Sequence, residues 1–138
     1  MTFNNDKPIY LQIVDLVCTS ILSGEYRASE RIPALRELSA QLEVNINTVI
    51  RSLDYLQQNE IIYNKRGLGF FVSDSAVESI KAIRRKTFME TTLPKFIEEM
   101  KVLGISWQEV MALTEAKTMD NGLWQQKQNL QNAFSSIP

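Results

Sequence analysis

The stretch from Pro33 to Val72 limits the possible folds of this chain more than any other part of its sequence. Two helix-length segments, 34–42 and 46–59, are separated by only three residues. Two short apolar runs, IIY and FFV, come next and enclose a tip, NKRGLG, that carries two basic residues and two glycines. β-Branched and aromatic residues favour strands, and glycines permit the positive φ of a tight hairpin. The stretch therefore predicts two helices at a tight joint, followed by strands at roughly 61–65 and 69–73.

This order of elements is typical of a winged helix-turn-helix, in which one helix enters a DNA groove and the hairpin, or wing, lies on the DNA backbone. We predict a mostly α fold with a small β-hairpin (α+β). The winged helix-turn-helix would occupy residues 1–74, and a short helical region would occupy 75–138. Sequence-specific binding of double-stranded DNA is accordingly the first hypothesis for function.

Composition argues against catalysis. The chain has no histidine and one cysteine, Cys18. Ser-His-Asp sites, Cys-His sites and nearly all zinc sites are thereby excluded. The glycines of the tip do not form a phosphate-binding loop, because the pattern is short and no helix follows it. We expect no enzymatic activity, no cofactor and no metal. Cys18 lies in or near an apolar stripe of helical spacing through 9–21, and we expect it to be a small core residue.

Nothing in the sequence predicts a secretory or membrane segment. The N-terminus shows no charged stretch followed by an apolar one, and no apolar run approaches the ~20 residues that span a bilayer. Four basic residues between 81 and 86 could mark a membrane-surface helix, but Glu78 and Glu90 beside them favour a solvated face. We expect a cytoplasmic protein without membrane association, in keeping with its single cysteine.

The charge of the chain is distributed unevenly. Residues 1–75 carry seven basic and nine acidic side chains, and this balance by itself argues weakly against DNA as a partner. From Asn45 to Leu53, however, there is no acidic residue and one arginine, and Lys65 and Arg66 are unopposed at the hairpin tip. Phosphate contacts act within about a Debye length, ~8 Å, so local placement outweighs the sum.

The helical segment 46–59 has two distinct faces. Its apolar face comprises Ile46, Val49, Leu53 and Leu56. The opposite face carries Asn47, Arg51 and Tyr55, with Thr48 and Asp54 flanking it, and Asn45 fits the N-cap. Asparagine can bind adenine and arginine can bind guanine in a bidentate manner, while threonine can reach a phosphate or a thymine methyl. These side chains could instead form an ordinary solvated face, but the preceding helix and the wing favour a DNA-reading face.

The hairpin tip offers a second set of candidate contacts. Lys65 and Arg66 could touch phosphate or the minor groove; alternatively, they keep an edge strand soluble, as lysine often does. Ile32 could pair with the wing as a single short β-bridge. Ala34 takes the N-cap of the first helix of the pair, where it lacks a capping side chain.

These motifs together resemble the GntR family of bacterial transcription regulators. The matching residues are PIYLQIVDLVCTSILSGEY at 8–26, RIPALRELSAQLEVNINTVIRSLDYLQQNEIIY at 31–63 and KRGLGFFV at 65–72. The opening PIYLQI and the short C-terminal part resemble the YtrA-type subfamily, whose small helical C-terminal region serves dimerisation. Carried over by position, the resemblance implies DNA contacts from Arg36, Asn45, Asn47, Thr48, Arg51, Arg66 and Gly67.

The chain also departs from the pattern of that subfamily. Ile46 stands where proline is common, and Ile50 stands where a polar residue is common. Ile50 could touch a thymine methyl or pack internally. Glu60 replaces a glycine usual at the end of the recognition helix, and we expect Asn59 to take the left-handed conformation instead. Leu68 replaces a frequently basic wing residue, which should lower affinity for DNA by one phosphate contact.

Residues from 75 onward predict helices that cannot enclose a core of their own. Pro94 either kinks a long helix or begins a new one, and Gly104 ends it. Ser106 and Glu109 then form the signature of a capping box. The apolar stripe of these helices should be buried against a second copy of the chain. The resulting homodimer would place two recognition helices on half-sites about one DNA turn apart.

Two features of this region leave alternatives open. Phe96, Met100 and Trp107 could line a pocket for a small-molecule effector, although such a stripe is more often core or dimer interface. The tail from Met119 contains Leu123, Leu130, Phe134 and Ile137, which suggest either a third docking helix or a disordered end.

The sequence as a whole predicts a homodimeric transcription repressor on a palindromic operator. The alternative is a winged-helix module for protein or RNA interaction without sequence-specific DNA binding, and the acidic balance of residues 1–75 favours that alternative.

Overall fold

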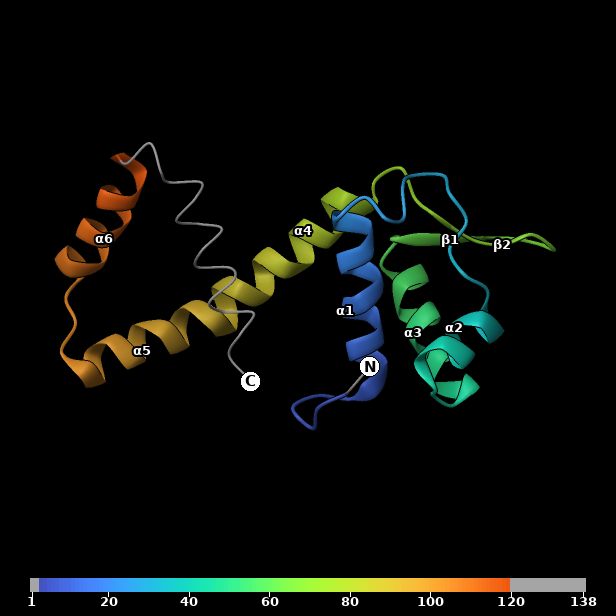
Figure 1. Ribbon diagram of the computed structural model, residues 1–138, viewed down its shortest axis with the longest axis horizontal. Coiled ribbons are helices and arrows are strands. Elements are labelled where there is room, and N and C mark those ends of the chain that lie inside the picture. Colours follow the sequence, from blue (N-terminus) through green and yellow to red (C-terminus); the bar gives the residue numbers. More distant parts are fainter. Residues whose placement is uncertain (1–2, 120–138) are drawn as a thin grey trace. The chain divides into compact units, whose positions relative to one another are not determined.

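The computed structural model describes residues 3–119 and divides the chain into two units, Met1–Thr87 and Phe88–Pro138 (Figure 1). The first unit contains α1 (Ile9–Leu22), α2 (Leu35–Leu42), α3 (Ile46–Gln58), β1 (Ile62–Lys65), β2 (Gly69–Val72) and α4 (Ala76–Thr87). The second contains a π-helical turn, η1 (Phe88–Thr92), followed by α5 (Leu93–Leu103) and α6 (Trp107–Met119). The predicted fold class, mostly helical with one hairpin, is confirmed.

The joint between α2 and α3 is built by local bonds. Ala34 is the N-cap of α2 and makes no side-chain capping bond, as its identity predicts. Glu43 ends α2 in the left-handed conformation, with φ 54°, and the Ser39 hydroxyl donates to the Val44 carbonyl over 2.7 Å. The side chain of Asn45 then accepts the backbone N–H of Asn47 at 2.8 Å, so Asn45 caps α3 as predicted.

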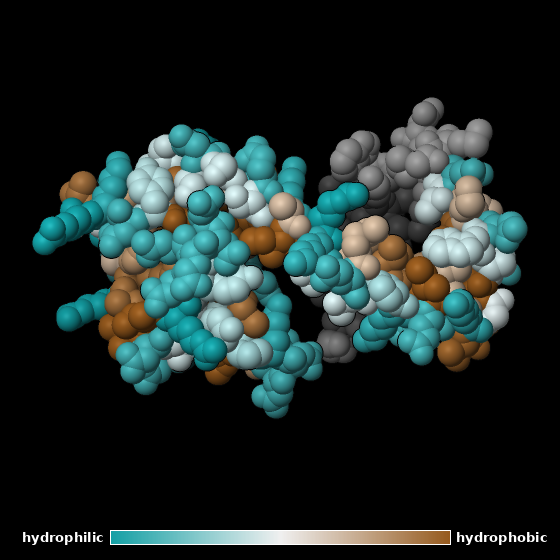
Figure 2. Space-filling view, turned by 180° about the vertical axis from the view of Figure 1, so that it is seen from behind, coloured by the Kyte–Doolittle hydropathy of each residue, from teal (hydrophilic) through white to brown (hydrophobic). Residues whose placement is uncertain are grey.

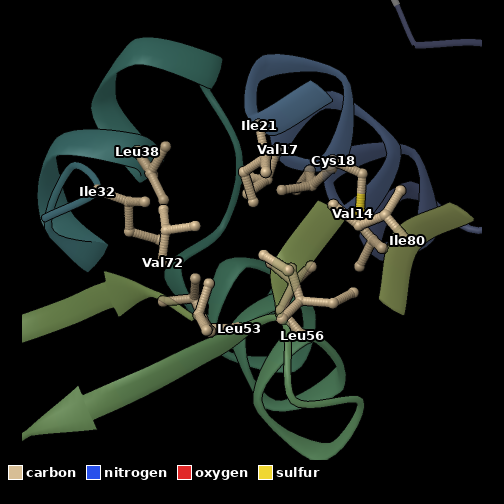
Figure 3. Packing of buried hydrophobic residues seen from close by; sticks show 14 of the residues in the cluster. Val14, Val17, Cys18, Ile21, Ile32, Leu38, Leu53, Leu56, Val72 and Ile80 are labelled. Atoms are coloured by element: carbon tan, nitrogen blue, oxygen red, sulfur yellow. The ribbon is translucent and has the colours of Figure 1, made fainter. Parts of the chain in front are cut away.

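The core of the first unit lies between α1, α3 and the wing (Figure 3). Ile13 from α1 and Val49 and Leu56 from α3 are fully enclosed. Cys18 is also buried in this cluster and is a core residue, as expected. Burial of such aliphatic side chains is the main favourable term in folding, at ~1.5–3 kcal/mol each.

Helix α4 packs against the rest of the first unit. Its Ala76 and Ile80 are buried in the core, and the Arg84 guanidinium donates to the Asp15 carbonyl and to the Thr19 hydroxyl, 3.3 and 3.1 Å away. The first compact unit therefore extends to Thr87 and includes the beginning of the region predicted for 75–138.

The wing is a two-stranded antiparallel hairpin in which Ile62 pairs with Val72 and Lys65 with Gly69. The connector before α2 adds one β-bridge, between Arg31 and Phe71. The Ile32 N–H donates to the Phe70 carbonyl at 3.0 Å, so the short pairing with the wing is present, with its bridge one residue before the predicted Ile32. The base of the wing is thereby fixed to the chain segment that leads into α2.

The end of α3 differs from the prediction. Glu60, and not Asn59, takes the left-handed conformation, with φ 59° against −91° for Asn59. The Ile61 N–H donates to the Leu56 carbonyl, and the Glu60 N–H donates to the Gln57 carbonyl. These are the two bonds of a Schellman motif, which requires the left-handed residue directly before the buried Ile61. The position of Ile61 in the core, rather than the identity of residue 60, decides where the chain reverses.

In the second unit, Pro94 lies in the first turn of α5, directly after the π-helical turn. Proline is tolerated there because the first N–H groups of a helix have no partner within it. Gly104 ends α5 with φ 68°, and the Ser106 hydroxyl accepts the Glu109 N–H at 3.2 Å, as the capping signature predicts. The tail residues Leu123, Leu130, Phe134 and Ile137 lie outside the described residues.

The described part of the second unit buries little of its apolar surface (Figure 2). Met100 is buried. The large apolar side chains that remain exposed are Phe88, Met89, Phe96, Val102, Leu103, Ile105, Trp107, Met111 and Leu113. None of the helices described is long and apolar enough to cross a membrane.

Candidate nucleic-acid interface

Helix α3 presents a polar face that begins at its N-terminus. Asn47 and Arg51 are exposed, and Thr48 is half-buried on the flank of this face. The side-chain oxygen of Asn45 is occupied by the capping bond to Asn47, so Asn45 fixes the start of the helix. The first carboxylate along α3 is Asp54, which leaves the first two turns of the helix free of negative side chains. Within these two turns no carboxylate opposes the approach of phosphates or base edges.

Arg51 stacks on an aromatic ring from another helix. Its guanidinium carbon lies 3.9 Å from the centroid of the Tyr10 ring, at the start of α1. A cation over a ring face is held by the ring quadrupole, so the long side chain of Arg51 has a defined position. Tyr10 was not among the predicted site residues.

Ser52 links the same two helices. Its hydroxyl oxygen lies 2.9 Å from the Tyr10 carbonyl oxygen and 3.0 Å from the Thr48 carbonyl oxygen. Ser52 is fully buried, and this contact joins α3 to the backbone of Tyr10, the residue whose ring stacks with Arg51. A serine in the middle of a helix, on its apolar face, was the signal that could have drawn attention to this position.

The hairpin tip holds the predicted basic residues in different ways. Arg66 and Gly67 are exposed at the turn, where Gly67 has φ 78°. Lys65 lies over the wing itself, with its Nζ 4.6 Å from the Phe71 ring centroid and 5.8 Å from that of Tyr63. These two rings stack on each other with their centroids 5.9 Å apart. Lys65 therefore combines a positive charge with an aromatic support on the hairpin.

Arg31 is a further cation of the wing that sequence reasoning missed. Its Nε lies 3.0 Å from the position that a Cβ on Gly69 would occupy, so its side chain passes directly over the backbone of that glycine. Gly69 has φ 109°. Arg31 is distant from the hairpin in sequence and reaches it only through its β-bridge to Phe71. Its place immediately before the predicted pairing residue Ile32 was the available signal.

Arg36 lies at the start of α2. It is exposed and is the second residue of that helix, where backbone N–H groups lack intrahelical partners. A helix N-terminus with a nearby arginine is a favourable position for a phosphate. Helix α2 contacts α3, and α3 contacts β1. The three elements that carry the predicted residues are therefore packed one against the next.

Comparison with known proteins gives this arrangement its context. Residues 9–72 match the family model of bacterial regulatory proteins of the gntR family. The chain is 32% identical over 109 residues to the HTH-type transcriptional regulator YhcF of Bacillus subtilis, covering 79% of this chain and 88% of that protein. The chain belongs to the GntR family. A second GntR-type relative, the HTH-type transcriptional repressor YtrA of Bacillus subtilis, is 30% identical over 71% of this chain and 69% of its own length.

Solved structures agree with this assignment. A GntR-family transcriptional regulator from Bacteroides thetaiotaomicron superposes with a TM-score of 0.69 at 42% identity, over 79% of this chain and 95% of its own. The predicted family and fold are confirmed. The family and the relatives named here are transcription regulators, as expected for a GntR protein that is not an enzyme. The residues that match the family model, 9–72, all lie within the first unit of this chain.

The second unit of this GntR protein contains an apolar hollow of about 310 Å³. Its lining includes Phe96 and Met100, two of the three residues predicted to line an effector pocket, together with Ile105, Val110, Leu113 and Thr114. Trp107, the third predicted residue, is not part of this lining and is half-exposed.

Proposed function

We propose that this GntR-family regulator is a cytoplasmic repressor that binds a palindromic operator as a homodimer. Helix α3 enters the major groove, and the wing lies on the adjacent backbone. The observation that carries the proposal is the polar face at the start of α3, where Asn47 and Arg51 are exposed, residues 46–53 include no carboxylate, and Arg51 stacks on Tyr10. Repression is supported by the name of the relative YtrA, a transcriptional repressor.

The residues divide into two kinds of contact. Asn47 and Arg51 read base edges, and Thr48 reaches a phosphate or a thymine methyl. The remaining candidates, Arg36, Lys65, Arg66 and the backbone at Gly67, bind phosphates or the minor groove and position the domain on the duplex. Asn45 acts mainly by capping α3, because its side-chain oxygen is engaged with the Asn47 N–H. Arg31 joins the phosphate contacts of the wing because its guanidinium lies against Gly69, the residue that pairs with Lys65 in the hairpin.

The homodimer is supported by the exposed apolar side chains of the second unit. Val102, Leu103 and Leu113 are each exposed over more than half of their surface. Contiguous exposed apolar area marks interaction surfaces in soluble proteins. We infer that the region from residue 75 onward serves dimerisation through α5 and α6, and that two copies present two α3 helices to successive major grooves.

The test is selection of bound duplexes from a random DNA pool, followed by sequencing. Recovery of an inverted repeat, with half-sites about one helical turn apart, is expected for a dimer of this kind. The affinity of the recovered duplex should fall steeply as salt rises, because each phosphate contact releases counterions. A folded protein that enriches no sequence would contradict the proposal and would favour the protein or RNA interaction module instead.

A further inference from the structure

Two isoleucines lie on α3 beside the proposed base-reading residues. Ile46 and Ile50 are each 39% exposed, whereas Val49, Leu53 and Leu56 of the same helix are completely or almost completely buried. The sequence placed Ile46 on the core-facing side, and its exposure is therefore a correction. At ~3.6 residues per turn, positions four apart lie one above the other on a helix surface. Ile46 and Ile50 consequently form one apolar row along the first two turns.

This row directly adjoins the polar face. Residues three apart are neighbours on a helix surface, so Ile50 lies beside Asn47, one of the proposed base readers. Single exposed aliphatic side chains are common and need no explanation. Two of them in one row, at the N-terminal end of the helix proposed to enter DNA, lie at the part of that helix that would approach the bases.

We propose that Ile46 and Ile50 read thymine, by packing their side chains against thymine 5-methyl groups in the major groove. The inference rests on the proposed function, since it requires α3 to lie in that groove. The thymine methyl is the apolar group that the major-groove edges of the bases present, and it distinguishes thymine from cytosine at the same position. β-Branched side chains are stiff at χ1, so little rotamer freedom is lost when they pack against a methyl group.

The expected loss of affinity follows from the apolar surface that each isoleucine–methyl contact removes from water. Loss of one buried methyl contact should reduce affinity about fourfold, which corresponds to ~0.8 kcal/mol per buried methylene. Thr48 is the competing source of a methyl contact, and it lies on the opposite flank of the polar face from Ile46 and Ile50. The experiment must therefore separate the isoleucines from Thr48.

Two random duplex pools test the proposal, one amplified with thymidine triphosphate and one with deoxyuridine triphosphate. Uracil pairs as thymine does but lacks the 5-methyl group. The full-length protein should enrich an operator containing fixed thymines from the first pool. From the second pool it should enrich sequences that keep the bases read by Asn47 and Arg51. These sequences should show no preference at the positions where the first pool had thymine. Each thymine-to-uracil change in the recovered duplex should then weaken binding about fourfold.

Alanine variants show which isoleucine is responsible for the difference in affinity between thymine and uracil. Ile46→Ala and Ile50→Ala should each abolish the difference between thymine and uracil at one position, because the contact is already absent. Val77→Ala, at a similarly exposed β-branched residue on α4, is the matched control and should keep the wild-type difference. Circular dichroism and urea unfolding of each variant verify that the domain remains folded.

The outcomes distinguish the inference from the function on which it rests. If neither pool yields an enriched sequence, the proposed operator binding is wrong. If both pools yield the same sequence with equal affinity, operator binding stands and methyl reading is wrong. A thymine preference that persists in the Ile46→Ala/Ile50→Ala double variant would overturn the assignment to these residues and point to Thr48.

Discussion

The guanidinium carbon of Arg51, on α3, lies 3.9 Å from the centroid of the Tyr10 ring, on α1. The fully buried Ser52, next to Arg51, contacts the carbonyl of the same Tyr10. The side chain proposed to read a base is thus held by a helix outside the helix-turn-helix. A side chain that is positioned before DNA arrives loses less rotamer entropy on binding, which is the general basis of preorganised recognition.

The first prediction concerns this stack. Tyr10→Leu should weaken operator binding roughly two- to fivefold, because a cation–π contact at an exposed site contributes about 0.5–1 kcal/mol. Tyr10→Phe keeps the ring and should bind as the wild type does. Titration of a fluorescent operator duplex measures both variants. An increase in affinity for Tyr10→Leu would mean that the stack holds Arg51 away from the groove, and an equal loss for Tyr10→Phe would mean that the hydroxyl is responsible.

The second prediction concerns the wing glycines. Both Gly67, with φ 78°, and Gly69, with φ 109°, have backbone conformations that disfavour a Cβ. Alanine at either position should lower the free energy of unfolding by roughly 1–2 kcal/mol. Gly69→Ala should cost more, because its Cβ would meet Arg31 Nε at 3.0 Å, whereas nothing lies within 4 Å of a Cβ at Gly67.

Urea unfolding of the two alanine variants measures this difference. The excess cost of Gly69→Ala should disappear in an Arg31→Ala background, since the clashing side chain is then absent. Equal costs for the two glycines in both backgrounds would show that Arg31 moves aside freely and is not held over the hairpin.

The third prediction concerns pH. Burial raises the pKa of the Cys18 thiol to about 11. The charge of Arg84 lowers this pKa by a smaller amount, and the charge of Asp15 raises it slightly. In the unfolded chain the thiol ionises near ~8.5, so between that pH and about 11 the unfolded state binds fewer protons at this site. The free energy of unfolding should therefore fall as pH rises through this window. Below it the thiol is protonated in both states and contributes no pH dependence.

Comparison with Cys18→Ala isolates this contribution, because the two proteins differ in no other ionisable group. The wild type should lose more stability than the variant between neutral pH and about pH 10.5, measured by urea unfolding. Parallel pH profiles for the two proteins would contradict a raised thiol pKa.

Features that depend on neighbours in sequence were predicted well. Ala34 and Asn45 at the helix N-caps and Ser106 before α6 follow from local capping rules. The family resemblance and the winged helix-turn-helix follow from the ordered motifs in 8–72. Each of these depends on side chains and backbone groups a few residues apart, and such relations can be read directly from the order of residues.

Features that depend on tertiary packing were missed or placed wrongly. The contact of Tyr10 with Arg51 and the passage of Arg31 over Gly69 join distant parts of the sequence, and no local rule predicts them. Helical periodicity placed Ile46 on the core-facing side, but the core covers Val49 and leaves Ile46, at the very start of α3, exposed. The left-handed residue at the end of α3 was placed one position too early, because the return of Ile61 into the core decides it.

The fourth prediction concerns the dimer. Leu103 on α5 is 71% exposed in the single chain, so a charge there should not disturb the fold of the chain but should oppose burial against a second copy. Sedimentation equilibrium should give a dimer mass for the wild type and a lower mass for Leu103→Glu. Leu68→Glu is the matched control, because Leu68 is 61% exposed but lies in the wing. A monomer mass for the wild type, or unchanged mass for Leu103→Glu, would argue against dimerisation through this surface.

The fifth prediction separates base reading from phosphate binding. Arg51→Ala should weaken operator binding by roughly 1–3 kcal/mol and relax the base preference at one position, with little effect on random duplex. Arg66→Ala should weaken operator and random duplex alike and reduce the salt dependence of binding by about one phosphate contact. Arg85→Ala, at an exposed arginine on α4, is the control for loss of charge alone and should change neither.

The distinction depends on where each side chain is held. Arg51 stacks on Tyr10 near the start of α3, whereas Arg66 extends from a solvent-exposed turn of the wing. Affinity titrations of operator and random duplex at several salt concentrations give both quantities in one experiment. Equal losses on the two duplexes for Arg51→Ala would remove it as a base reader. The stack with Tyr10 would then serve only to join α1 and α3.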